Sequence, residues 1–182
     1  MIQILEQLPQ VFSHFDFNQR NLLIRQAANG GDELVALDWA CAGTGALGGE
    51  LVSLIGSSAM LYEFDPAGLP VLEAAAYPEY LAGLREAGWD GDPQQVRLAY
   101  CAWLALWCGA MMPAFASLYG AENGPGITLF DCQPEEMIAG WAIMCDFALD
   151  RGEEARRLVQ QLGQKPPQKG ETERSRRPAV RA

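Results

Sequence analysis

Four polar residues near the start of the chain have the types and spacing that phosphoryl transfer needs: His14, Asp16, Asn21 and Asp38. Mg²⁺ is a hard cation that takes a few protein oxygens and leaves its other positions to water and phosphate, so the amide oxygen of Asn21 and the carboxylate of Asp38 suit it. The Asp16 carboxylate would stand clear of the metal and orient an attacking hydroxyl. Phosphoryl transfer depends on such positioning and on charge neutralisation.

These residues can act together only if the fold brings Asn21 to Asp38. The sequence between them holds two short apolar runs, residues 22–24 and 34–37, joined through Asn29, Gly30 and Gly31. Apolar runs around a glycine-containing turn predict a β-hairpin. The start of its first strand would lie beside the end of its second, and Asn21 would therefore meet Asp38.

This order of residues resembles the catalytic core of the aminoglycoside phosphotransferase and choline kinase family, relatives of the protein kinases. The resemblance implies that Asp16 is the catalytic base, that Asn21 and Asp38 hold magnesium and with it ATP, and that His14 shapes the catalytic loop. The motif covers about a seventh of the chain, and the helical remainder fits the family's C-terminal lobe. It is carried by His14-Phe15-Asp16, Asn21, Asp38-Trp39 and Gly43.

A complete kinase of this type also has an N-terminal lobe of strands, with a phosphate-covering loop and a lysine that holds the nucleotide. Here about a dozen residues precede the loop, and the first lysine is Lys165. We therefore expect a C-terminal lobe alone, with dependence on a separate N-terminal lobe. The glycine-rich residues 43–49 lack a phosphate-binding pattern. They resemble the segment leading to the family's next helix, with Glu50 where the family usually has a loop-bracing Asp.

The predicted fold is mainly α with one small β-hairpin. Within a domain over residues 1–163, we expect a catalytic loop at 13–21, the hairpin at 22–38 and a helical bundle at 47–162. Apolar spacing and breakers predict the individual helices. These cover residues 1–12, broken at Pro9; 47–64; 78–87, ended by Gly88; 93–119, capped by Asp92 and bent at Pro113; and 134–162. Residues 164–182 are polar and predict a disordered basic tail.

Charge narrows the partners that the chain could bind. The net charge is -10, and the chain up to Gln164 alone carries about -14. This argues against nucleic acid and anionic membrane as partners, although the basic tail leaves a nucleic-acid-binding arm as an alternative. An acidic surface would favour a cationic substrate such as an aminosugar, with Asp131, Glu135, Asp146 and Asp150 as candidates to line its pocket, but a charged, solvated exterior is the commoner explanation of such a charge.

Cysteine usage and hydropathy predict a cytoplasmic protein. The five cysteines are an odd number without a CxxC pair, and the chain has a single histidine, which argues against zinc and disulfides. No signal segment opens the chain, and no apolar run reaches the length needed to span a membrane. Residues 98–118 come close, but their Trp, Cys, Gly and Pro content indicates a buried core helix.

The interpretation is therefore an ATP- and Mg²⁺-dependent phosphotransferase that acts on a small-molecule hydroxyl, such as that of an aminosugar, choline or another sugar, in a truncated or partner-dependent form. The alternative is a catalytically inactive helical binding or scaffold domain that keeps the loop as inherited structure. Each residue also has a structural explanation. Asp and Asn commonly cap turns, and a histidine among apolar residues is commonly structural.

Overall fold

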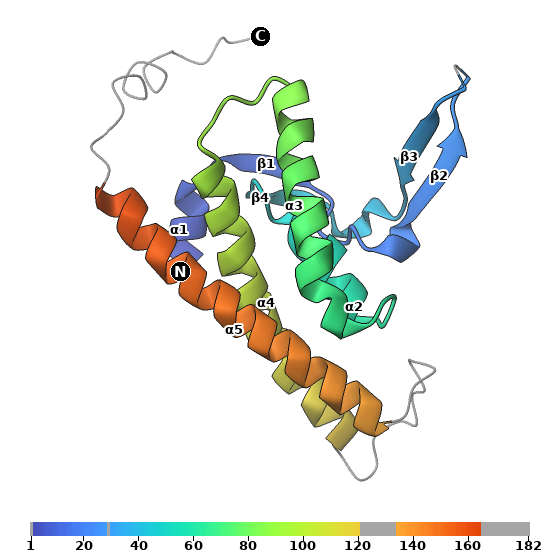
Figure 1. Cartoon of the computed structure of the whole chain (residues 1–182), viewed down its shortest axis with the longest axis vertical. Helices are drawn as coiled ribbons and strands as arrows, with labels where there is room; N and C mark the ends of the chain where they lie inside the picture. The colour runs from blue at the N-terminus through green and yellow to red at the C-terminus, as the bar shows by residue number, and fades with distance from the viewer. Residues whose placement is uncertain (1, 29, 121–133, 165–182) are drawn as a thin grey trace.

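The computed structural model describes residues 2–28, 30–120 and 134–164. It is mostly helical, with two small antiparallel sheets, as the predicted fold class requires (Figure 1). The strands are β1 (Gln10–Ser13), β2 (Leu22–Gln26), β3 (Asp32–Ala36) and β4 (Gly43–Ala46). The helices are α1 (Ile2–Gln7), a π-helical turn (Val52–Ser57), α2 (Ser58–Met60), α3 (Leu69–Glu86), α4 (Pro93–Gly120) and α5 (Pro134–Gln164), with short 3₁₀ turns at Gln19–Asn21, Trp39–Cys41 and Pro66–Gly68.

The predicted hairpin is confirmed. Strands β2 and β3 pair in antiparallel register from Leu22 opposite Ala36 to Gln26 opposite Asp32. Gly30 closes the turn with a φ of 82°, a conformation that glycine adopts at low cost. The hairpin projects from the helical body (Figure 1), and most of its side chains are exposed.

A second sheet was not predicted. The helix expected over residues 1–12 ends at Gln7, and beyond Pro9 the chain forms β1. Strand β1 pairs with β4, from Gln10 opposite Ala46 to Ser13 opposite Gly43. Pro9 cannot donate to a helix, while its carbonyl accepts a hydrogen bond from Leu47 N at 2.8 Å. Part of the glycine-rich stretch is therefore a strand. This strand was not recognisable in the sequence because its partner lies far away along the chain.

Two predicted helix boundaries were wrong. The helix expected over residues 47–64 is short, and its central turn at Val52–Ser57 is π-helical. Helix α3 runs unbroken through Pro78, where we expected a break. Proline removes one helical hydrogen bond, that to the carbonyl four residues earlier. Both Pro78 and Ala74, which carries that carbonyl, are exposed, so water can replace the bond.

The signals for two helix ends were interpreted correctly. Gly88 ends α3 with a φ of 86°, while Trp89 N donates to Leu84 O and Gly88 N donates to Arg85 O, as in a Schellman motif. Asp92 caps α4, with its Oδ1 accepting from Gln94 N at 2.9 Å. These signals are local in sequence, which is why they were visible there.

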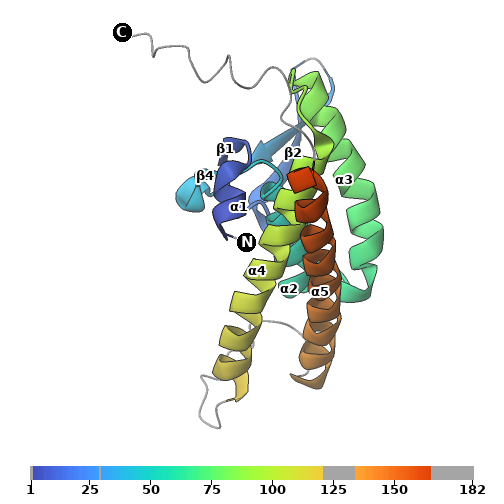
Figure 2. The same cartoon turned by 90° about the vertical axis from the view of Figure 1, so that its left-hand side faces the viewer.

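Helices α4 and α5 run side by side and form the centre of the fold (Figure 2). By length and composition alone, Pro93–Ala114 of α4 could cross a membrane, with a mean hydropathy of 1.2; half of that stretch is buried, as in a core helix. Its apolar side chains pack with those of neighbouring helices. The most deeply buried large side chains are Tyr100, Leu51, Ile55, Leu69, Leu98, Val52 and Val96.

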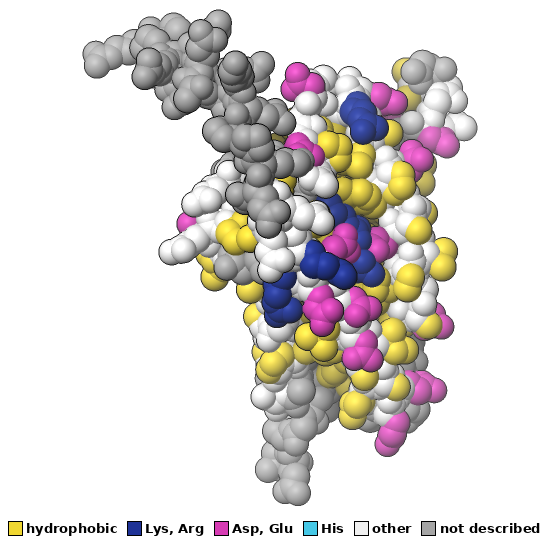
Figure 3. Space-filling model, turned by 60° about the vertical axis from the view of Figure 1, so that its left-hand side comes forward, with side chains coloured by type: hydrophobic (Ala, Val, Ile, Leu, Met, Phe, Trp, Pro, Cys, Tyr) yellow, Lys and Arg dark blue, Asp and Glu magenta, His cyan; other side chains and the backbone are white. Residues whose placement is uncertain are grey.

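A charged network ties α3, α4 and α5 together. Arg97 on α4 donates two hydrogen bonds to Glu154 on α5, at 2.6 and 2.8 Å, and lies 3.1 Å from Glu73 on α3. Arg151 reaches the same two carboxylates, at 2.7 and 3.5 Å. Hydrogen bonding from Arg97 lowers the pKa of Glu154 to about 2. On the face drawn in Figure 3, basic and acidic side chains interleave in this way among hydrophobic ones.

Several predictions lie outside the described residues. These are the tail at 165–182, the loop that contains Asp131, and Asn29 in the hairpin turn. They stay predictions.

The network gives a pH dependence. Because the pKa of Glu154 is lower in the folded than in the unfolded chain, its stabilising effect is present above about pH 5 and is lost as the pH falls towards about 2. Glu154→Gln should lower the free energy of unfolding by roughly 1 to 3 kcal/mol at pH 7. It should also flatten the loss between pH 5 and 2, measured by urea unfolding followed by far-UV circular dichroism. Glu153→Gln, an exposed neighbour, is the control; identical pH profiles for both variants would contradict this role of Glu154.

Candidate active site

The hairpin brings the two predicted metal ligands to one end. Asn21 immediately precedes β2 and Asp38 follows β3. The Asn21 carbonyl accepts a hydrogen bond from Leu37 N at 2.8 Å, so the strand pairing extends to the residue next to Asp38. The part of the prediction that concerned the backbone is therefore confirmed.

Asp16 is held by two asparagines. Asn18 Nδ2 donates to its Oδ1 at 2.7 Å, and Asn21 Nδ2 donates to its Oδ2 at 2.8 Å and to its backbone carbonyl at 2.9 Å. These hydrogen bonds orient the Asp16 carboxylate. Asn18 is 4% exposed and was missed. Its position two residues after an aspartate, in a turn, was the signal that could have found it.

His14 is buried and bridges the loop to the hairpin. Its Nε2 lies 2.7 Å from Leu37 O, and Asp16 N donates to its Nδ1 at 3.3 Å. These two bonds fit the tautomer with the proton on Nε2. Glu50 accepts a hydrogen bond from His14 N. Both ring nitrogens are thus used within the fold, which makes His14 a positioning residue in this geometry, and Glu50 braces the loop despite its longer side chain.

Phe15 adopts a left-handed conformation, with a φ of 59°, which is rare for a bulky residue. Its carbonyl accepts a hydrogen bond from Ser53 Oγ at 3.0 Å. Its ring packs on β4, where a Cβ added at Gly45 would lie 2.8 Å from Phe15 Cε1 and closer still to Cζ. Residues in such a backbone conformation are often found at functional sites. The Phe15 ring therefore occupies the space that a side chain at Gly45 would fill.

The other end of the loop is anchored by residues about 40 positions later. Gln19 N donates to Ser58 Oγ at 3.3 Å and to Glu63 Oε2 at 3.1 Å. Arg20 pairs with Glu63 at 3.0 Å, and the Glu63 side chain is almost fully buried. The sequence carried no signal for these contacts because they depend on the packing of α2.

Asp38 is exposed, with a left-handed φ of 54°. Its Oδ1 accepts a long hydrogen bond, 3.4 Å, from Ala40 N, so the capping role that is common for such residues is present here. This bond leaves carboxylate lone pairs free. No hydrogen bond of the described residues uses Asn21 Oδ1 either. Asn21 Oδ1 and the Asp38 carboxylate are hard oxygen ligands of the kind that Mg²⁺ prefers.

No group of three or more His, Cys, Asp or Glu side chains among the described residues could hold a metal by itself. A magnesium ion at this site would therefore be coordinated by Asn21 and Asp38 and by oxygens of water and phosphate. Such a mixed coordination shell is usual for Mg²⁺ in phosphate-transferring sites.

The cavities within the described part of the chain include the following three. The largest, about 770 Å³, lies between α4 and α5 and away from the loop, with walls formed by small and apolar residues such as Ala105, Met112 and Ala148. A smaller one, about 160 Å³, lies between α1 and β4. The third, about 300 Å³, adjoins His14. Of these three, the third alone combines residues of the loop at 13–21 with Trp39, next to Asp38.

The acids expected to line a substrate pocket do not line these cavities. Glu135, Asp146 and Asp150 are exposed, and none of them is part of the walls between α4 and α5, between α1 and β4, or beside His14. The solvated acidic surface, the other interpretation of the charge, fits these three residues better.

No protein-family model, curated protein or solved structure matches this chain. The resemblance to the phosphotransferases therefore depends on the motif residues and on their geometry alone.

The packing of Phe15 on β4 is testable with two glycines. Gly45→Ala should destabilise the fold by about 1 to 3 kcal/mol, because the added methyl group overlaps the Phe15 ring. Gly83→Ala, in α3 with nothing within 4 Å, should stabilise it by about 0.5 to 1 kcal/mol. Thermal and urea unfolding measure both. If Gly45→Ala proved as stable as Gly83→Ala, Phe15 would not pack as described.

Proposed function

We propose that this chain supplies the catalytic loop of a magnesium- and ATP-dependent phosphotransferase of the aminoglycoside phosphotransferase type. One observation carries the proposal: the Asn21 carbonyl bonds to Leu37 N, next to Asp38, while the Asn21 side chain bonds to Asp16. Three polar groups at the spacing of the motif are thereby linked at one end of a hairpin. The acceptor would be a small hydroxylated molecule, and the acidic chain favours a cationic one.

In this proposal Asp16 orients the acceptor hydroxyl and takes its proton as the new oxygen–phosphorus bond forms and the bond to the leaving ADP breaks. Asn18 and Asn21 fix the direction of the Asp16 carboxylate. Asn21 Oδ1 and the Asp38 carboxylate would hold magnesium, which neutralises phosphate charge when bound. His14 positions the loop against the hairpin.

The described residues include no lysine that could hold nucleotide phosphates. We therefore expect transfer to need a further nucleotide-binding lobe, and binding of Mg·ATP to this chain alone to be weak. A cytoplasmic location, without nucleic acid or membrane as a partner, belongs to the same proposal.

The second candidate is a binding or scaffold domain. Two observations favour it. Both oxygens of Asp16 are engaged inside the fold. The projecting hairpin also exposes apolar side chains, with Leu23, Ile24 and Leu34 each more than half exposed, and exposed apolar groups of this kind are typical of surfaces that bind partners.

Titration calorimetry with Mg·ATP tests the metal site. We expect weak binding, with a dissociation constant on the order of 1 mM. Asp38→Asn should weaken the binding of Mg·ATP more than that of ATP without metal, because it removes a metal ligand. Asp90→Asn, an exposed aspartate, is the control. No heat with Mg·ATP from a folded chain would contradict the nucleotide site.

Asp16→Asn separates the two candidate functions. In a phosphotransferase, this variant should lose transfer to aminosugar or choline acceptors by at least about 10²-fold, since it removes the base, and should keep its far-UV spectrum and its binding of Mg·ATP. Radiolabelled phosphate transfer measures this. A wild-type chain that transfers nothing with any acceptor, with or without a supplied nucleotide-binding lobe, would favour the scaffold.

A further inference from the structure

The large cavity between α4 and α5 carries three sulfur-containing side chains in its wall. Cys108 and Met112 line it from α4, and Cys145 lines it from α5. The cavity has a volume of about 770 Å³, and apart from Arg156 its remaining walls are small or apolar residues. The residues of the candidate active site are not among them, so this cavity is a separate feature of the fold.

The three sulfur atoms come from facing surfaces of the two helices. Cys108 and Met112 are four residues apart on α4, so their side chains are neighbours on one helix face. Cys108 Sγ lies 4.0 Å from the carbonyl oxygen of Met144, the residue before Cys145. The thiols of Cys108 and Cys145 also share a hydrogen bond. The helices therefore hold two thiols and a thioether close together at one place in the wall.

Buried cysteine and methionine side chains usually serve as packing groups. Here the same side chains border an open space instead of filling the core. Burial raises the pKa of the Cys108 thiol to about 12, and its contact with Cys145 acts in the same direction. Cys108 is therefore a protonated thiol at neutral pH, which argues against a nucleophilic cysteine, because that role needs a thiolate.

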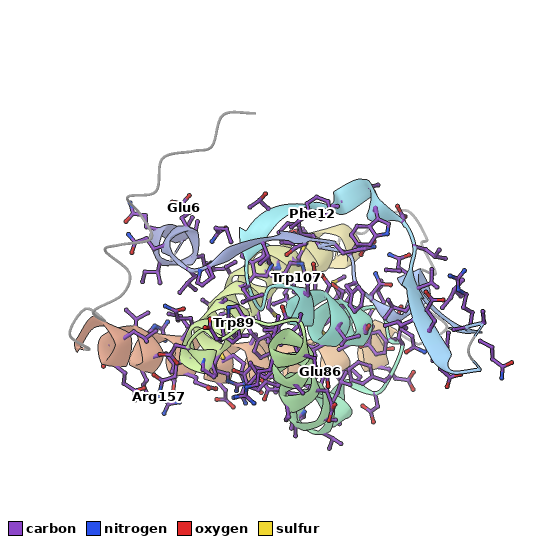
Figure 4. All side chains as sticks on the ribbon, turned by 90° about the horizontal axis from the view of Figure 1, so that it is seen from above. Glu6, Phe12, Glu86, Trp89, Trp107 and Arg157 are labelled. Carbon is purple, nitrogen blue, oxygen red and sulfur yellow. The ribbon has the colours of Figure 1, made fainter. Side chains whose placement is uncertain are left out.

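The cavity reaches the surface of the molecule. Leu149, which lines it, is 66% exposed, and Cys145 is half-buried. Figure 4 shows Trp107, next to Cys108, near the centre of the molecule and Arg157, on α5, at its edge. A buried metal site needs an entry path of this kind.

We propose that Cys108, Met112 and Cys145 form a binding site for a soft monovalent metal ion, Cu(I). Thiolate and thioether sulfur are the ligands that select Cu(I). Zn²⁺ fits poorly because it takes a tetrahedral set of nitrogen, sulfur or oxygen ligands, and no group of three or more His, Cys, Asp or Glu occurs in the described part of the chain. Mg²⁺ and Ca²⁺ need oxygen ligands, which this wall does not offer.

Binding exchanges a proton for the metal ion. One of the two thiols releases its proton to water and its sulfur forms a bond to Cu(I), while no electron is transferred. The thiolate and the monovalent ion together are neutral, so the apolar wall gains no net charge. The second thiol and the Met112 thioether complete the site through sulfur lone pairs. Because none of these groups belongs to the candidate active site, the metal site does not depend on phosphotransfer.

Competition with bicinchoninate, a chromophoric Cu(I) chelator, tests the site. The full-length chain carries Cys41→Ala and Cys132→Ala as a background, because Cys41 is exposed and Cys132 lies outside the described residues. It is titrated into the Cu(I) complex of bicinchoninate without oxygen. We expect the chain to withdraw about one Cu(I) per molecule. X-ray absorption at the copper edge should show sulfur atoms as the nearest neighbours of the metal.

Three further variants in this background identify the ligands. Cys145→Ala should weaken Cu(I) binding by at least about 10²-fold, because it removes a direct ligand. Met112→Leu nearly keeps the apolar volume but removes the thioether, and it should weaken binding about tenfold. Cys101→Ala is the matched control and should bind Cu(I) as the background chain does. Cys101 is a buried cysteine of the same helix and is not part of the cavity wall.

Far-UV circular dichroism checks that each variant is folded. If Cys145→Ala does not fold, Met112→Leu decides: weaker binding supports the site, and unchanged binding contradicts it. The proposal would also be overturned if the background chain withdrew no Cu(I), if Cys101→Ala lost as much affinity as Cys145→Ala, or if the copper had nitrogen or oxygen neighbours alone. Binding of Zn²⁺ as tight as that of Cu(I), measured with a chromophoric zinc chelator, would contradict the selectivity for a soft monovalent ion.

Discussion

The contacts of His14 are the constraint on which the candidate site depends. Its backbone N–H is held by Glu50, its ring bonds to the carbonyl of Leu37, and it receives the N–H of Asp16. One residue thus joins the helical body, the hairpin and the loop at residues 13–21. Because the imidazole is buried, these bonds are made away from competing water, where their geometry is best defined. These contacts hold the loop against Leu37, the neighbour of Asp38.

The fold divides its stabilisation between two kinds of polar contact. The helices are joined by Arg97 and Arg151 with Glu73 and Glu154, all partly buried. Removing one member of such a network costs more than the network contributes, because its partners keep their charge in a poorly solvated place. The loop is held by hydrogen bonds of its backbone: Ser53 Oγ donates to Phe15 O, and Gln19 N donates to Ser58 Oγ and Glu63 Oε2.

The sequence was informative where structure follows from neighbouring residues. The hairpin was predictable because two short apolar runs flank a glycine turn, and the start of α4 because Asp92 and Pro93 stand together. The Glu50 position was visible through the resemblance, but whether its longer side chain would reach His14 was not. What could not be predicted depends on distant partners. Strand β1 forms because Gly43–Ala46 lies beside it, and Asn18 takes its role from its hydrogen bond to the Asp16 carboxylate. Spacing along the chain does not reveal such contacts, because only the folded structure brings their partners together.

The hairpin has a consequence for behaviour in concentrated solution. It is a sheet of two strands, and each strand therefore has an outer border along which its peptide groups lack a neighbouring strand among the described residues. At such a border, a strand of another polypeptide can form backbone hydrogen bonds and extend the sheet. Arg25 and Glu33, opposite each other and 2.8 Å apart, put charged side chains on both of these border strands. Those charges should discourage uncontrolled growth of the sheet.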